Sequence, residues 1–164
     1  MNRLALLIGG NQGDRHWLIE QATVLIQQRI GAVVAVSADY ETEPWGDFGQ
    51  EKPQRFLNRA LLVATPLVPH AALAEAQAIE RELGRQRRPG VGSSSPHRVY
   101  SSRPMDIDLI FWNDEVIDTP DLQIPHPRAH LRRFVLEPLA EIMPDYRHPT
   151  LGQTVAELLA RLDA

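Results

Sequence analysis

Two carboxylates stand two residues apart inside the apolar stretch 103–112, whose sequence is RPMDIDLIFW. In a β-strand successive side chains point to opposite faces, so Asp106 and Asp108 share one face, about 6.5–7 Å apart at Cα. Carboxylates this close repel each other unless a cation lies between them. Mg²⁺ suits such a pair, because proteins hold it through one or two carboxylates together with substrate phosphates. The other face of the strand is apolar and carries Met105, Ile107 and Leu109.

A solvent-facing sheet edge is the alternative interpretation of this acidic pair. The apolar run from Leu109 to Trp112 is typical of a buried strand rather than an exposed edge, and Arg103 precedes it as a group for an anion. Because buried carboxylates need partners, we favour metal-assisted phosphoryl chemistry.

Residues 85–103 are rich in Arg, Pro, Gly and Ser and poor in apolar side chains. Such a segment cannot bury enough surface to fold alone, so we expect a mobile loop. Guanidinium groups bind phosphate oxygens through planar bidentate donors, so beside the acidic strand the loop predicts a lid over a polyphosphate, with a solvated basic loop as the alternative. Its arginines are Arg85, Arg87, Arg88, Arg98 and Arg103.

Two other stretches carry polar groups of interest. Residues 125–134 hold two histidines and three arginines without a carboxylate at zinc-ligand spacing, which favours phosphate contacts or a plain polar loop over a zinc site. Asn58 interrupts an apolar strand, and its carboxamide can donate and accept at the edge of a heterocycle. Trp45 and Phe56 can stack on such a ring, although core packing is the alternative for each. Residues 9–14, GGNQGD, lack the Gly-Lys-Ser/Thr ending of a phosphate loop, which favours a tight strand-to-helix turn.

The elements that position these residues follow from apolar periodicity. We expect strands at 4–8, 32–40 and 56–64, then the acidic strand, a turn at 113–115 and a brief strand at 116–117. We expect helices from Asp14 to Gly31 and from Pro69 to Gly84, and short helices from Pro125 onward, the last at 154–162. This order predicts an α+β, ferredoxin-like sandwich, an antiparallel sheet with two main helices on one face plus short C-terminal helices.

The composition narrows the functional class. The 164 residues favour a single domain spanning 1–164, and the net charge of −4 argues against a general nucleic-acid binder. The apolar runs are too short to span a bilayer, and the absence of cysteine excludes disulfides and thiolate zinc sites. We therefore expect a cytoplasmic monomer that acts on small molecules, with no nucleic-acid or membrane partner.

Several of these stretches, in this order, resemble the 6-hydroxymethyl-7,8-dihydropterin pyrophosphokinases of folate biosynthesis. The most specific is RPMDIDLI at 103–110, which is similar to the family signature almost residue for residue. Further motifs match at 9–14, 40–46, 56–58 and 124–134, so the resemblance covers most of the chain. The sequence departs from the family pattern at Gly10, Glu43, Phe56 and Pro127.

The resemblance implies transfer of pyrophosphate from ATP to the hydroxymethyl group of 6-hydroxymethyl-7,8-dihydropterin, with release of AMP. It implies that Asp106 and Asp108 bind two Mg²⁺ ions. The implied catalytic, phosphate-contacting residues are Arg85, Arg87 (with Arg88 as an alternative) and Arg103. The implied ATP-binding residues are Gln77, Glu80, Tyr100, Ile107, His126 and Arg132. The implied pterin-binding residues are Thr42, Pro44, Trp45, Phe56, Asn58 and Phe134.

Two rival functions stay open on the residues alone. A nucleotidyl- or glycosyltransferase can use a D-x-D metal site, but it releases pyrophosphate or a nucleoside diphosphate rather than AMP. A ferredoxin-like RNA-binding module carries exposed aromatic side chains on its central strands. The acidic strand has carboxylates instead, which argues against that module.

Overall fold

The structure of the protein is a computed structural model, which describes residues 1–43, 54–84 and 104–163. The strands are β1 (Asn2–Gly10), β2 (Ala32–Val36), β3 (Tyr40–Thr42), β4 (Phe56–Thr65), β5 (Asp106–Trp112), β6 (Ile117–Thr119) and β7 (Leu122–Ile124). The helices are α1 (Arg15–Arg29), α2 (Pro69–Gly84), the 3-10 helix η1 (Ala129–Leu131), α3 (Arg133–Ile142) and α4 (Val155–Asp163).

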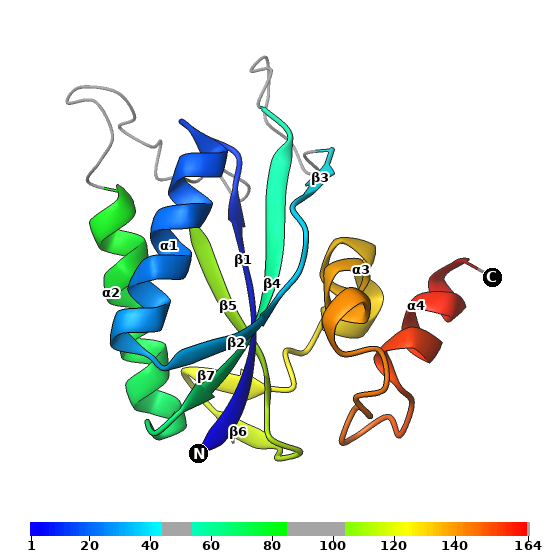
Figure 1. Cartoon of the computed structure of the whole chain (residues 1–164). Helices are drawn as coiled ribbons and strands as arrows, with labels where there is room; N and C mark the ends of the chain where they lie inside the picture. Colours follow the sequence, from blue (N-terminus) through cyan, green and yellow to red (C-terminus); the bar gives the residue numbers. More distant parts are fainter. Residues whose placement is uncertain (44–53, 85–103, 164) are drawn as a thin grey trace.

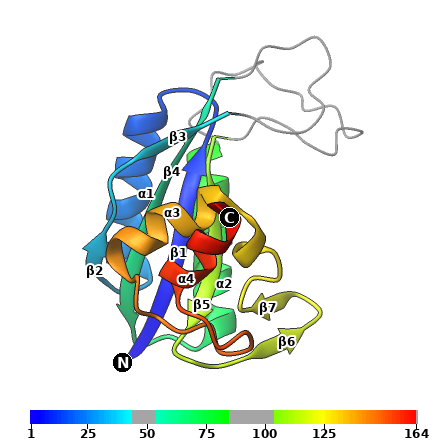
Figure 2. The ribbon, with the colours of Figure 1, turned by 90° about the vertical axis from the view of Figure 1, so that its right-hand side faces the viewer.

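The main sheet has the strand order β2-β4-β1-β5, with every neighbouring pair antiparallel, and β3 pairs with the other end of β4. Helices α1 and α2 cover one face of this sheet, and α3 and α4 cover the other (Figures 1 and 2). A separate hairpin, β6–β7, lies beyond β5. The ferredoxin-like arrangement expected from the sequence is confirmed, with the short C-terminal helices as a layer on the second face.

Each sheet face has its own apolar core. Toward α1 and α2, the alternate β1 residues Leu4, Leu6 and Ile8 are fully buried. Toward α3 and α4, Ala5 and Leu7 join a second cluster with residues from both helices. The two-residue period of a strand thus divides one sequence run between two cores.

Local signals explain where the helices begin. Gly13 has a φ of +71°, and Asp14 then caps α1 by accepting a hydrogen bond from the Trp17 N–H at 3.1 Å. At α4, the Thr154 hydroxyl accepts from the Glu157 N–H at 3.1 Å, and the Glu157 carboxylate accepts from the Thr154 N–H at 3.0 Å. This reciprocal pair is a capping box. None of the described helices is long and apolar enough to cross a lipid bilayer.

Three sequence expectations need correction. The single strand at 32–40 is two strands, because residues 37–39 step from one end of β4 to the other. The acidic strand β5 is an edge strand of the main sheet and not an interior one. Its apolar residues are still buried, because α2, α3 and the hairpin lie around it. The brief strand expected at 116–117 is the hairpin β6–β7, whose second strand the sequence did not indicate.

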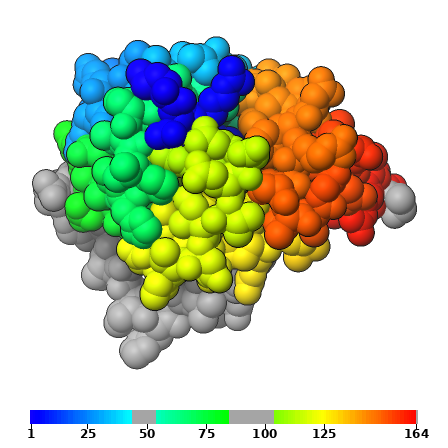
Figure 3. All heavy atoms as spheres, turned by 90° about the horizontal axis from the view of Figure 1, so that it is seen from below, coloured from blue at the N-terminus to red at the C-terminus, as the bar shows by residue number. Residues whose placement is uncertain are grey.

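Seen from below, the β5–β7 part of the chain forms the surface between the α2 region and the C-terminal segment (Figure 3). A register shift between Ala5 and Leu6 leaves Ile110 of β5 without a paired position. Because of this bulge, Ile110 and Phe111 both belong to the core under α3 and α4, while Trp112 returns to the other core. The strand is therefore apolar on both faces at one end and acidic on one face at the other.

Candidate active site

A polar row crosses the second face of the sheet near the end of β1. Gly9 pairs with Asn58 of β4 on one side and with Asp106 of β5 on the other. One row along, Leu7 pairs with Ala60 and with Asp108. Antiparallel partners point to the same face, so Asn58 and both carboxylates lie on the face that α3 covers.

The same-face geometry of the two aspartates is confirmed. Their intervening residue, Ile107, is buried in the core under α1 and α2, as are Met105 and Leu109. Asp106 is half-buried and Asp108 is exposed, although the sequence suggested buried carboxylates. Within the described residues, β5 lies at the edge of the main sheet and has a strand neighbour on one side only.

Helix α2 supports the acidic strand from the other side. The Glu80 carboxylate accepts a hydrogen bond at 2.7 Å from the N–H of Ile107, the residue between the aspartates. An edge strand leaves alternate N–H groups without a strand partner, and Glu80 satisfies one of them. Gln77 and Leu73 precede Glu80 at helical spacing, so all three lie on the α2 stripe that faces β5.

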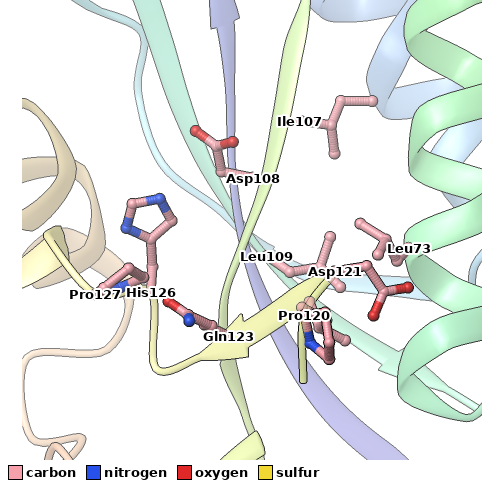
Figure 4. Close-up of a pocket in the computed structure, with 10 residues that line it drawn as sticks. Leu73, Ile107, Asp108, Leu109, Pro120, Asp121, Gln123, His126 and Pro127 are labelled. Carbon is pink, nitrogen blue, oxygen red and sulfur yellow. The ribbon is translucent and has the colours of Figure 1, made fainter. Parts of the chain in front are cut away.

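A pocket of about 290 Å³ lies along the edge of β5, between α2 and the hairpin. In Figure 4, Asp108 and His126 lie on one side of β5, and Leu73 and Ile107 lie on the α2 side. The pocket therefore links the acidic face of the strand to an apolar region. Its lining residues are Leu73, Ile107, Asp108, Leu109, Pro120, Asp121, Leu122, Gln123, His126 and Pro127.

His126 is held beside β5 by its backbone N–H, which donates to the Ile110 carbonyl at 3.0 Å. Burial, and then the guanidinium groups of Arg132 and Arg128, lower the pKa of His126 below its ordinary value. Its Nδ1 accepts from the Arg128 N–H at 3.2 Å, so the neutral ring carries its proton on Nε2. At neutral pH this side chain therefore offers an uncharged donor to a ligand.

Among the residues expected to bind the pterin, those that the structure describes lie on the same face. Asn58, which is 6% exposed, donates from Nδ2 to the Thr42 hydroxyl at 3.4 Å. Phe56 pairs with Thr42 in the register of β3 and β4. Phe134, on the first turn of α3, packs against the core of this face, and the Arg132 guanidinium lies 5.6 Å from the centre of its ring.

Gly9 is a site residue that the sequence interpretation missed. A Cβ atom at this position would lie 2.1 Å from the Leu57 carbonyl oxygen and 2.4 Å from the Asn58 Oδ1. Only glycine therefore fits between the amide and Asp106 without moving the backbone. The available signal is the Gly-Gly pair that ends β1: the residues alone favour a tight turn there and the resemblance indicates a family motif at 9–14, but neither assigns Gly9 a role.

The donors in the described part of the chain suit Mg²⁺ better than zinc. Across residues 1–43, 54–84 and 104–163, no group of three or more His, Cys, Asp or Glu side chains could hold an ion. Zinc sites use three or four protein ligands, whereas Mg²⁺ takes most of its ligands from phosphates and water. Two carboxylates on one strand face fit the second kind of ion. The expected site residues Pro44, Trp45, Arg85, Arg87, Tyr100 and Arg103 lie outside the described residues.

Comparison with known proteins gives one consistent family. A family model described as 7,8-dihydro-6-hydroxymethylpterin-pyrophosphokinase (HPPK) matches residues 5–144. Proteins named 2-amino-4-hydroxy-6-hydroxymethyldihydropteridine pyrophosphokinase are similar over most of their length. That of Porphyromonas gingivalis is 40% identical over 88% of this chain and 92% of its own, and that of Methylorubrum extorquens is 39% identical over 99% and 95%. That of Bacillus subtilis is 41% identical over 87% and 79%.

Solved structures agree in fold. A crystal structure of an HPPK-DHPS chain in complex with substrates matches with a TM-score of 0.71 at 15% identity, and the Plasmodium falciparum HPPK-DHPS with pteroate matches with 0.74 at 18% identity. Each match covers 98% of this chain but only 43% and 42% of the solved chains, so this chain spans less than half of their length. At this identity the likeness is one of fold, and the family rests on the matches described above. This chain belongs to the 7,8-dihydro-6-hydroxymethylpterin-pyrophosphokinase family.

Proposed function

We propose that the face carrying Asn58, Asp106 and Asp108 binds both substrates of the family reaction. That reaction transfers pyrophosphate from ATP to the hydroxymethyl group of 6-hydroxymethyl-7,8-dihydropterin and releases AMP. Family membership confirms the pyrophosphokinase activity in folate biosynthesis that the sequence predicted. The observation that supports the placement is the strand pairing at Gly9, which has the carboxamide of Asn58 as its neighbour on β4 and the carboxylate of Asp106 as its neighbour on β5.

We assign the pocket at the edge of β5 to ATP. Its Asp108 and His126 side leads to the acidic pair, and its apolar side is formed in part by Leu73 and Leu122. A nucleotide has one anionic end and one aromatic end, so the triphosphate belongs beside Asp108 and the base toward α2. Ile107 contributes its side chain there, and Gln77 lies one turn along α2 from Leu73. Glu80 acts through the backbone of Ile107.

Asp106 and Asp108 would hold two Mg²⁺ ions together with the triphosphate. When bound, the ions supply neutralisation of the phosphate charge. The protein residues position the reacting groups. Strand β5 fixes the two carboxylates on one face, and Glu80 fixes the backbone between them. His126 and Arg132 lie where they can donate to phosphate oxygens, one as a neutral ring and the other as a cation.

We assign the pterin to the space between β3, β4 and α3. The Asn58 carboxamide can donate and accept at the edge of the heterocycle, and Phe56 and Phe134 supply aromatic faces. Gly9 allows the Leu57 carbonyl and the Asn58 amide to approach β1 closely, which fixes Asn58 against this strand. Holding the hydroxymethyl group beside the β-phosphorus in this way accelerates transfer by orientation, because an in-line attack needs a defined approach.

Several of the site and cellular assignments remain predictions. Pro44 and Trp45 on the pterin side, and Arg85, Arg87, Tyr100 and Arg103 on the phosphate side, rest on the sequence and on the family resemblance. The cytoplasmic location and the monomeric state rest on the composition. We propose that residues 1–164 act as one pyrophosphokinase domain, since both helical layers pack on one sheet.

Product analysis tests the reaction. The purified protein is incubated with ATP, Mg²⁺ and 6-hydroxymethyl-7,8-dihydropterin, and the nucleotides are separated. We expect AMP and the pterin diphosphate in equal amounts. Formation of ADP, or release of free pyrophosphate in place of the pterin diphosphate, would contradict the proposal.

Metal dependence is tested separately. We expect a chelator to stop AMP formation and added Mg²⁺ to restore it. Titration of Mg²⁺ into the protein with a non-hydrolysable ATP analogue should give two ions per chain. Full activity after complete chelation would overturn the metal assignment and leave the reaction itself intact.

A further inference from the structure

The three residues between β2 and β3 are anchored to the centre of the sheet. The Ser37 N–H donates to the Ala60 carbonyl at 3.0 Å, and the Ala60 N–H donates to the Ser37 hydroxyl at 2.8 Å. This exchange replaces a ladder rung at the point where the chain steps from one pairing with β4 to the next. The connection between β2 and β3 is therefore fixed to β4 at its first residue, Ser37.

On the α1 side, the same segment is held by an ion pair. The Arg59 guanidinium donates to both oxygens of Asp39, at 2.7 and 3.1 Å, and also to Thr23 at 3.1 Å and Glu20 at 2.6 Å. A planar guanidinium with two parallel bonds to one carboxylate fixes its orientation as well as its distance. Strand β3 thus cannot slide along β4.

On the opposite side, one carboxylate of α3 receives the segment. Glu141 accepts the Tyr40 hydroxyl at 2.5 Å, and its two oxygens accept the Ala38 N–H at 3.2 and 3.1 Å. The bond to Glu141, with burial, raises the pKa of Tyr40 to about 12, so the phenol stays a donor at physiological pH. These bonds join residues about a hundred positions apart in the sequence.

The two elements joined by Glu141 are those that carry the pterin side. Tyr40 pairs with Asn58 in the β3–β4 register, and Thr42, on the same face, accepts from the Asn58 carboxamide. On α3, Phe134 precedes Glu141 by seven residues, two helical turns, and so lies on the same stripe of the helix. Fixing Glu141 on β3 therefore also sets the separation of Phe134 from Asn58 and Thr42.

We propose that Glu141 is a positioning residue for the pterin site, an inference that rests on the function proposed above. Through its bonds to the Tyr40 hydroxyl and the Ala38 N–H, Glu141 fixes α3 relative to β3. The aromatic ring of Phe134 is thereby held at a defined distance from the polar side chains of Asn58 and Thr42. It does not touch substrate in this role. The ATP pocket lies across the row on β5 and α2, and Glu141 contacts neither element through these bonds.

The test separates the two substrates. Glu141→Ala and Tyr40→Phe are assayed for AMP formation with each substrate varied in turn. We expect the KM for the pterin to rise about 10-fold in Glu141→Ala and about 3-fold in Tyr40→Phe, by the loss of hydrogen bonds of ordinary strength. The KM for ATP should stay within about 2-fold. The double variant should match Glu141→Ala alone, because both changes remove one shared contact.

Two matched variants distinguish positioning from a general loss of stability. Glu75→Ala removes a carboxylate of the same kind, which binds Arg29 at 2.9 Å between α2 and α1, far from the pterin side. It should lower the melting temperature about as much as Glu141→Ala and leave both KM values unchanged. Glu141→Gln retains an acceptor oxygen of the same reach and should recover most of the pterin KM.

The outcomes are decisive in either direction. An unchanged pterin KM in Glu141→Ala, or a rise of both KM values together, would overturn the role of Glu141. Failure of the unaltered protein to form AMP from the pterin would instead overturn the proposed function. The same assay therefore distinguishes the two outcomes: the Glu141→Ala variant tests the role of Glu141, and the unaltered protein tests the proposed function.

Discussion

The two faces of the sheet differ along their length. Toward α1 and α2, the alternate β1 residues Leu4, Leu6 and Ile8 form part of one continuous core. Toward α3 and α4, the face is apolar at Ala5 and Leu7 and then changes to Gly9, with a carboxamide and a carboxylate as its neighbours. Along β1, the first face therefore packs against helices throughout. The second face has an apolar region that packs against helices and a polar region that belongs to the proposed site.

The buried charge on the first face does not alter this contrast. Arg59 lies there, 9% exposed, and each of its bonds goes to Asp39, Glu20 or Thr23 of the same layer. A buried cation with such partners contributes to stability rather than to catalysis. Loss of a partner would leave a buried charge without compensation and would destabilise the fold. We therefore expect substitutions in the β1 part of the first face to change stability, and those at the polar end of the second face to change activity.

The largest effect is expected for Asp108→Ala. This change removes an exposed carboxylate, so the melting temperature should stay close to that of the unaltered protein. AMP formation should fall more than about 10³-fold, because charge neutralisation by a metal is worth several kcal/mol in the transition state. Asp118→Ala, at an exposed position of β6, is the matched control and should keep full activity. Near-normal turnover of Asp108→Ala with Mg²⁺ would contradict the assignment of Asp108 as a metal ligand.

Adjacent leucines of β1 compare the faces directly. Leu6 and Leu7 are 0% and 4% exposed and point to opposite cores. Each change to Ala should lower the free energy of unfolding by about 2–5 kcal/mol, measured by urea denaturation. Only Leu7→Ala should also lower kcat/KM of the folded fraction, by about 3–10-fold, because Leu7 is the cross-strand neighbour of Asp108. Equal losses of kcat/KM in both variants would show that the faces are not separable.

Gly9→Ala adds a methyl group at the boundary between packing and chemistry. The new Cβ would meet the Leu57 carbonyl and the Asn58 amide, so β1 and β4 must move apart there. We expect a loss of about 1–3 kcal/mol in unfolding free energy and a larger rise in the KM for the pterin than for ATP. A variant with unchanged pterin KM would show that the space at Gly9 is not part of the pterin site.

The sequence predicted most strands and helices of the main fold, because the signals for each element are local. Strand and helix periods, the Asp14 cap and the glycine-ended helices each depend on a few neighbouring residues. The errors lie where tertiary contacts decide. Residues 32–40 alternate in polarity like a single strand. However, Ser37 is hydrogen-bonded to Ala60 and Asp39 to Arg59, both of β4, and these contacts interrupt the strand between Val36 and Tyr40. The edge position of β5 depends on strand order, which no local pattern encodes.

The same division applies to the site. The sequence predicted that Asp106 and Asp108 share one face of their strand, because side chains alternate with a two-residue period. The structure confirms this placement. Glu80 was expected on the nucleotide side by resemblance, but its bond to the Ile107 N–H depends on the packing of α2 on β5. The bond between Tyr40 and Glu141 has no sequence signal, because the two residues are about a hundred positions apart and no local spacing relates them. Gly9 could have been found by asking which glycine faces a polar partner across a strand pair.

The second face also carries the histidine on which an acid response can be tested. His148, 5% exposed, packs edge-on against Phe111 and lies 6.1 Å from the ring of His130. Burial, and then His130, lower the pKa of His148 below its ordinary value. Its Nδ1 accepts from the backbone N–H groups of Thr150 and Leu151, at 3.2 and 3.1 Å, so the folded state uses the neutral ring.

The smallest expected effect follows from the sign of that shift. The unfolded chain binds the His148 proton near pH 6.5, whereas the folded chain binds it only at lower pH. The unfolded state therefore holds more protons between these two values, and the free energy of unfolding falls as the pH drops through this window. His148→Asn keeps an acceptor for the backbone N–H groups but cannot titrate, so its loss of stability between pH 7.5 and 5.5 in urea should be smaller than that of the unaltered protein. The difference between the two proteins in this window is at most about 1.4 kcal/mol, because the unfolded-state pKa lies about one unit above pH 5.5. An equal loss in both proteins would mean that the acid response comes from other groups, and that this end of the second face serves packing alone.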